Sequence, residues 1–216
     1  MRILMKIYKY TLVATALFCL STSFANAQNV QITPEIMDVE YSFRGNTYVI
    51  ERDQNPNATI PDFFAKTSRA CPPFCVQPLE INDEVQTVGE LELLAFLKEY
   101  VDTDKGFLVD SRTQDFYAKG TIPGAVNLSH ALLVPSDTNV FFDSIMAMLG
   151  GGQSSTGEWV FDNPKDLMLF CNGPWCGQSP AAIRHLLEIG YPAQKLHYYR
   201  GGMQSWVSMG FTTIIP

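Results

Sequence analysis

Short apolar runs alternate with helix-like segments in the part of the chain that begins at Val85. Runs of strand length occur at 85–88, 106–110, 122–128, 166–170 and 194–199. Apolar residues recur at helical spacing at 90–100, 113–119, 139–149, 179–189 and 203–209. Residues 150–158 are rich in glycine and serine and predict a loop. This order of elements predicts an α/β domain whose central parallel sheet carries helices on both faces.

A different pattern precedes this domain. Polar and apolar residues alternate at 39–43 and 47–51, which predicts a β-hairpin with Gly45-Asn46 in its turn. Further on, the sequence Cys71-Pro72-Pro73-Phe74-Cys75 excludes an ordinary helix through the two cysteines, because of its consecutive prolines. We therefore expect residues 28–83 to form a small hairpin and loop extension, and residues 84–216 to form the α/β domain.

The first 27 residues are typical of a secretory signal peptide. A basic start is followed by an apolar run at 11–20 and by the small-x-small sequence Ala25-Asn26-Ala27. The apolar run is too short to span a bilayer comfortably, so a retained membrane anchor is the weaker alternative. We therefore expect an exported protein in the periplasm, with no stable membrane insertion after cleavage at residue 27.

The charge of the chain restricts its partners. The formal net charge is −7, and the leader holds three basic and no acidic residues, so its removal takes the charge to −10. An acidic protein without a basic cluster is a poor ligand for nucleic acid or an anionic membrane surface. Neither is therefore an expected partner.

The candidate chemistry lies in the segment from Cys171 to Ser179. The apolar run at 166–170 leads into Cys171, and Ser179-Pro180 opens the next predicted helix. A cysteine between a strand and a helix start meets free backbone N–H groups and the positive end of the helix dipole, which lower a thiol pKa. In a parallel sheet this is also the edge where ligands bind. Cys171 is therefore the candidate nucleophile.

Four cysteines follow the leader, namely Cys71, Cys75, Cys171 and Cys176, and they allow three complete disulfide pairings. A structural Cys71–Cys75 disulfide is the simplest interpretation in an exported protein, and a redox partner for the Cys171 loop is the alternative. Neither pair has Cys-x2-Cys spacing and neither adjoins a histidine, so we expect no metal site and no cofactor. We further expect the extension to pack on the domain and to bring Cys71 and Cys75 near the loop.

Several motifs resemble those of rhodanese-like domains. Asp110-Ser111-Arg112, followed by Gly120-Thr121-Ile122-Pro123-Gly124-Ala125, is similar to the family's D-x-R…G-H-I-P-G-A signature. The strand, Cys171 and the helix from Ser179 resemble the family's active loop. The closing G-G-x-x-x-W-x-x-x-G occurs at Gly201, Gly202, Trp206 and Gly210. The resemblance spans about residues 84–213 and leaves out the extension.

The resemblance implies a three-layer fold and a sulfurtransferase that carries sulfane sulfur as a persulfide on Cys171. A small sulfur compound or a protein thiol would be the partner, and a thiol or cyanide the acceptor. Asp110 and Arg112 are expected to form a buried structural pair. The remaining loop residues would line the substrate site. Gly173 and Gly177 would supply special backbone angles, and Asn172 and Gln178 would face a bound anion. The other members of the loop are Pro174, Trp175 and Ser179.

The loop departs from the family at its sixth position, where an arginine is common and Cys176 stands here. Residues 171–179 contain no cation at all, and Thr121 replaces the usual histidine. Cys176 is a possible resolving or redox partner of Cys171, which leaves two alternatives to sulfur transfer. One is a periplasmic dithiol oxidoreductase that uses Cys171 and Cys176. The other is a non-catalytic rhodanese-like binding module.

Overall fold

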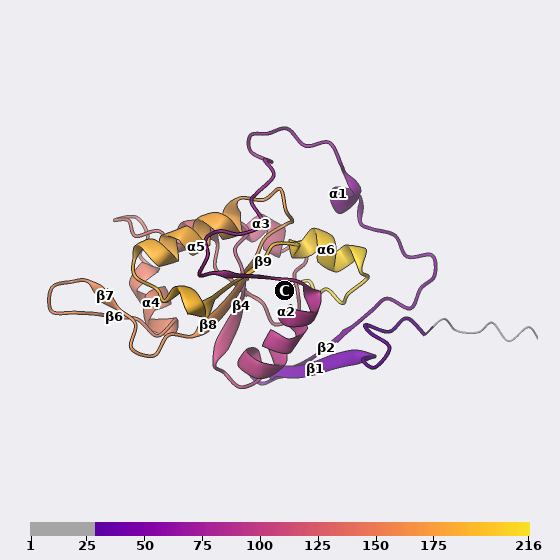
Figure 1. The fold of residues 1–216 in the computed structure, drawn as a ribbon, viewed down its shortest axis with the longest axis horizontal. Coiled ribbons are helices and arrows are strands. Elements are labelled where there is room, and N and C mark those ends of the chain that lie inside the picture. Colours follow the sequence, from indigo (N-terminus) through magenta and orange to yellow (C-terminus); the bar gives the residue numbers. More distant parts are fainter. Residues whose placement is uncertain (1–28) are drawn as a thin grey trace, which may run out of the picture.

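The computed structural model describes residues 29–216, so the expected leader lies outside the described residues. Its centre is a five-stranded parallel sheet in the order β3-β9-β8-β4-β5 (Figure 1). The strands are β3 Gln86–Val88, β4 Gly106–Asp110, β5 Val126–Asn127, β8 Asp166–Phe170 and β9 Leu196–Tyr199. Helices flank this sheet, which confirms the predicted three-layer α/β fold.

The register of the two central strands positions the functional loops. All five residues of β4 and all five of β8 are buried, as expected for strands covered on both faces. Asp110 is paired with Phe170, so both strands end at the same level. The segment after Asp110 therefore begins beside the segment after Phe170, which starts with Cys171.

The helices are α2 Glu90–Phe96, α3 Gln114–Tyr117, α4 Phe142–Met148, α5 Gln178–Glu188 and α6 Gly202–Ser208. The predicted helix 90–100 changes after Phe96 into a π-helical turn, Leu97–Val101. Helix α4 starts three residues later than predicted, because the Asn139 amide donates to the carbonyls of Leu132 and Val134 and so belongs to the preceding turn. Two 3-10 turns, His130–Leu133 and Ala193–Lys195, complete the domain.

The prediction of a loop at 150–158 holds for most of the segment but misses a short strand. This segment contains β6 Gly152–Gln153, which pairs antiparallel with β7 Trp159–Val160. The Ser154 hydroxyl accepts hydrogen bonds from the amides of Thr156 and Glu158 and closes the turn between the strands. Composition alone indicated flexibility there, whereas these short-range hydrogen bonds order the segment.

The extension forms the predicted hairpin, with β1 Asp38–Phe43 paired to β2 Asn46–Glu51. The turn is Arg44-Gly45, one residue earlier than predicted, because Asn46 already pairs with Phe43. Both turn residues have positive φ, 50° and 79°, as a tight hairpin turn requires. A short helix that the sequence did not indicate, α1 Asp62–Ala65, follows Pro61.

The hairpin shares the core of the domain. Tyr41, Phe43 and Ile50 are buried in the same apolar cluster as the central strands. The Tyr41 hydroxyl donates to the carbonyl of Pro123, and the Phe43 ring packs edge-on against Phe107. The extension therefore packs on the α/β domain. Within residues 29–216, no helix is both long enough and apolar enough to cross a bilayer.

Candidate active site

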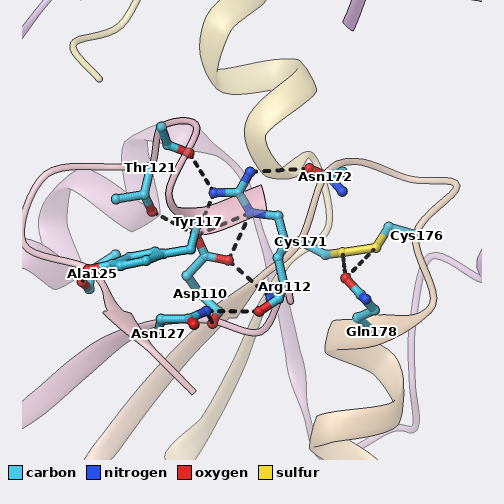
Figure 2. A network of polar contacts seen from close by, with 11 residues as sticks. Asp110, Arg112, Tyr117, Thr121, Ala125, Asn127, Cys171, Asn172, Cys176 and Gln178 are labelled. Carbon is cyan, nitrogen blue, oxygen red and sulfur yellow. Dashed lines mark hydrogen bonds and ion pairs between the residues drawn. A yellow bond between two sulfur atoms is a disulfide. The ribbon is translucent and has the colours of Figure 1, made fainter. Parts of the chain in front are cut away.

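The structure places Cys171 directly after β8, and the loop returns into α5 at Gln178 (Figure 2). Cys171 and Cys176 lie at disulfide distance, with their Cα atoms 6.1 Å apart. Only 3% of Cys171 and 7% of Cys176 are exposed. The two sulfur atoms therefore face one another inside the loop, and a bulky reagent has little direct access to them.

The start of α6 fixes the first residues of this loop. The amides of Met203 and Gln204 donate to the carbonyls of Cys171 and Asn172, both at 2.9 Å. This contact needs glycine at Gly202, where φ is +56° and where a Cβ atom would overlap the carbonyl of Cys171. The Gly-Gly motif at the start of α6 therefore shapes the loop after Cys171 from a distant part of the sequence.

The loop presents unpaired backbone N–H groups. Cys176 donates its amide to the carbonyl of Gly173 at 2.9 Å. Within residues 29–216, the amides of Trp175, Gly177 and Gln178 donate no hydrogen bond. Because the amides of Gly177 and Gln178 lie at the start of the 11-residue helix α5, they provide positive partial charge near the cysteines.

The prediction that Gly173 and Gly177 supply special backbone angles is wrong. Gly177 has φ −86° and neither glycine has positive φ. Gly173 is instead needed for space, since a Cβ atom there would lie 2.9 Å from Oε1 of Gln204 and 3.1 Å from Nε1 of Trp175. The loop is tightly packed and not strained at these positions.

The polar side chains of the loop face different ways. Gln178 points to the cysteines, with its Oε1 3.4 Å from Sγ of Cys171 and 3.7 Å from Sγ of Cys176. Asn172 is 2% exposed and points to Arg112 (Figure 2). The Ser179 hydroxyl is fully buried, and none of the described residues forms a hydrogen bond with it. Of these three side chains, only Gln178 contacts both sulfur atoms.

Asp110 and Arg112 form a buried network behind the loop (Figure 2). The Arg112 guanidinium donates to both Asp110 oxygens, with a closest distance of 2.6 Å, and to Oδ1 of Asn172 at 3.2 Å. Thr121, at the position of the family's histidine, donates its hydroxyl to Asp110 Oδ2 at 2.7 Å. The network ties the end of β4 to the active loop.

A segment of the extension lies across the loop; we call residues 63–78 the strap. The Gln77 amide donates to the carbonyl of Pro174 at 2.8 Å. The rings of Phe63 and Phe74 pack against Trp175, with centroid distances of 6.1 and 5.6 Å. The sulfur atoms of Cys71 and Cys75 are also at disulfide distance, with Cα atoms 4.6 Å apart. The expectation that the extension brings this cysteine pair close to the loop agrees with these contacts.

Sequence reasoning missed Arg69, which brings a cation to a loop that has none. Its guanidinium carbon lies 3.9 Å from the centroid of the Trp175 ring and 4.6 Å from that of Phe63. Desolvation by these rings lowers the pKa of Arg69. The sequence indicates this contact only weakly, because a single arginine among scattered aromatic residues does not show which ring it stacks on.

None of the three histidines contacts either loop cysteine in the described part of the chain. Burial lowers the pKa of His130 and of His197 and keeps both rings neutral near neutral pH. The site therefore brings together two cysteines and free amides, and no histidine of the described residues lies beside them as a general base.

A family model for the rhodanese-like domain matches residues 93–209. The chain belongs to the rhodanese-like family. The match includes Asp110, Arg112, Cys171 and Cys176, whereas the hairpin and the strap lie outside it. No curated protein matches the chain.

Solved structures of low sequence identity resemble the rhodanese-like domain. A protein of unknown function from Rhodopseudomonas palustris, described as a possible tyrosine phosphatase, is 18% identical with a TM-score of 0.43; the match covers 61% of this chain and 86% of that one. The human single-domain sulfurtransferase TSTD1 is 22% identical with a TM-score of 0.38, and 57% of this chain matches 96% of it.

Proposed function

We propose that this rhodanese-like protein is a sulfurtransferase that carries sulfane sulfur as a persulfide on Cys171. The observation that supports this most is the position of Cys171, between the end of β8 and the free amides at the start of α5. These amides would stabilise a thiolate, and then a persulfide anion, without a dedicated base. The partner is a small sulfur compound or a protein thiol.

The reaction begins when the Cys171 thiolate attacks the outer sulfur of the donor and expels sulfite or a thiolate. The product is a persulfide on Cys171. An acceptor thiolate or cyanide then takes the terminal sulfur and returns Cys171 to the thiolate. Alternatively, Cys176 attacks Sγ of the persulfidated Cys171, releases hydrosulfide and leaves a Cys171–Cys176 disulfide.

Intact-mass measurement tests the proposal. We expect the reduced protein to gain one sulfur atom after incubation with thiosulfate or glutathione persulfide, and cyanide to remove it. Cys171→Ala should lose both this gain and the transfer activity, whereas Cys176→Ser should keep a persulfide that lives longer. Full activity in Cys171→Ala would show that the assignment is wrong.

A second candidate function is dithiol–disulfide exchange with partner proteins. The observation that favours it is the disulfide distance between Cys171 and Cys176. An oxidoreductase of this kind should form mixed disulfides with its partners in Cys176→Ser, because the resolving thiol is missing. Trapped partners without any gain of sulfur would favour exchange. The absence of both trapped partners and a gain of sulfur would favour a non-catalytic binding module.

We also propose export to the periplasm, where cysteine pairs are commonly oxidised. Residues 1–27 support this by their sequence pattern alone. Fusion of these residues to alkaline phosphatase, which is active only after export, tests it directly. An inactive fusion that accumulates with its leader uncleaved would contradict the proposal.

A further inference from the structure

The four cysteines differ in exposure in a regular order. Cys71 is exposed, Cys75 is half-buried, and Cys176 and Cys171 are buried. A macromolecular reductant therefore reaches the strap pair before it reaches the loop pair. Any disulfide formed by Cys171 and Cys176 during turnover needs some route for electrons from outside.

Contacts on both sides of Cys75 hold this part of the strap against the loop segment that contains Cys176. Immediately before the two cysteines, the rings of Phe74 and Trp175 pack together at 5.6 Å. Just after them, the Gln77 side chain packs on Gly177, 3.6 Å from where a Cβ atom would lie. The same side chain donates to the carbonyl of Cys75 at 2.8 Å and so joins the strap cysteine to the residue that follows Cys176.

The strap is also fixed to the body of the domain. Arg200, at the end of β9, donates to the carbonyl of Gln77 at 2.8 Å and to that of Pro78 at 3.0 Å. Gln204 donates to the carbonyl of Phe64 at 3.2 Å. These bonds hold both ends of the strap beside the loop, which raises the effective concentration of Cys75 at Cys176.

We propose that the strap pair is an internal relay that reduces the loop pair. In the reduced strap, the Cys75 thiolate attacks Cys176 of the loop disulfide, forms a Cys75–Cys176 mixed disulfide and releases Cys171 as a thiolate. The Cys71 thiolate then attacks Cys75, forms the Cys71–Cys75 disulfide and releases Cys176. The loop gains two electrons and the strap loses two, and an external protein dithiol reduces the strap through the exposed Cys71.

This relay rests on the proposed function only in the branch in which Cys176 attacks the persulfide and leaves the loop as a disulfide. The relay can be tested through the four cysteines of the protein, without any sulfur donor. Failure of sulfur transfer and failure of the relay are therefore separate results.

The first experiment traps the relay intermediate. In Cys71→Ser/Cys171→Ser, only Cys75 and Cys176 remain after the leader, and oxidised glutathione should join them within one molecule. Peptide mapping should find the cross-link, with a loss of two hydrogens. In the matched variant Cys75→Ser/Cys171→Ser, Cys71 should join Cys176 about tenfold more slowly, because it is exposed and lacks the flanking contacts that hold Cys75 against the loop. Glutathione adducts alone, or equal rates in the two variants, would overturn the proposal.

The second experiment follows the route of electrons in the full-length chain. Reduced thioredoxin is the protein dithiol, and alkylation of the loop peptide reports reduction of Cys171–Cys176. Cys75→Ser should be reduced at least about tenfold more slowly than wild type. Val76→Ser, a change at a neighbouring side chain that is 80% exposed, should be reduced at the wild-type rate. Equal rates in wild type and Cys75→Ser would overturn the relay.

A small reductant controls for folding in both experiments. Tris(2-carboxyethyl)phosphine does not need the strap, so it should reduce the loop disulfide of wild type and Cys75→Ser at similar rates. A rate difference confined to thioredoxin supports the relay. A similar slowing with both reductants would show that the substitution alters the loop itself and would overturn the relay.

Discussion

Arg112 connects three parts of the chain with one side chain. Its guanidinium donates to the Asp110 carboxylate, to the carbonyl of Gly120 and to the side chain of Asn172. Asp110 is fully buried and Arg112 is 2% exposed, so neither charge has water as an alternative partner. The pair therefore acts as a support for the loop, because its donors are already used within the protein.

The first stability prediction concerns this pair. Asp110→Asn should lower the free energy of unfolding by about 3–5 kcal/mol, because it leaves the buried Arg112 charge without a counter-charge. Urea titration followed by circular dichroism measures the loss. Asp102→Asn removes the charge of the partly exposed partner of Lys98 and should cost much less, because solvent screens this pair. Equal costs for the two substitutions would contradict the proposed support role.

Individual residues were predictable where a local motif or a neighbour in sequence decides their place. Asp110 and Arg112 match the D-x-R motif of the family, and that resemblance implied the pair that the structure contains. The roles of Gly202 and Arg69 were not predictable. Gly202 is constrained by the carbonyl of Cys171, and Arg69 by the ring of Trp175. Both contacts join distant parts of the chain, and no spacing along the sequence encodes them.

The strap is the element that most distinguishes this chain from its rhodanese-like domain. It lies outside the family match, yet it packs on Trp175 and Pro174 of the active loop. Its helix α1 is only one turn long and its cysteine segment is rich in proline, so neither gave a periodic signal. The central strands β4 and β8 were predicted with their observed bounds, because buried parallel strands are continuous apolar runs.

The second prediction concerns the attachment of the strap. Arg69→Gln removes the cation from the faces of Trp175 and Phe63, which costs about 1 kcal/mol and raises the open population of the strap about fivefold. With both cysteine pairs reduced, alkylation of Cys176 by iodoacetamide should accelerate by the same factor. Lys66→Gln changes an exposed cation of the same strap and should leave the rate unchanged. An unchanged rate in Arg69→Gln would show that this stacking does not hold the strap closed.

At the scale of the whole molecule, extension and domain share one core. The alternating pattern of β1 and β2 predicted a hairpin with one apolar face. It did not predict which part of the domain this face packs against. The structure buries Tyr41 and Ile50 in the cluster that also contains β4 and β8. The two parts should therefore unfold together, in one transition.

The last prediction concerns stability and pH. Burial lowers the pKa of His197; the Asp166 carboxylate, 3.7 Å from its ring, opposes this shift, and Lys195 adds to it. The folded protein keeps His197 neutral, whereas the unfolded chain binds a proton below about pH 6.5. The unfolded state therefore holds more protons, and the free energy of unfolding should fall as the pH drops from about 6.5 towards 5. His130 contributes in the same direction, because burial lowers its pKa too. Urea titrations across this range measure the free energy of unfolding at each pH. A plot of this free energy against pH should be shallower for His197→Gln than for wild type, whatever the substitution does to the stability at pH 7. This slope depends on the difference in bound protons between the unfolded and folded states and not on packing. Equal slopes for wild type and His197→Gln would therefore contradict a neutral His197 in the folded protein.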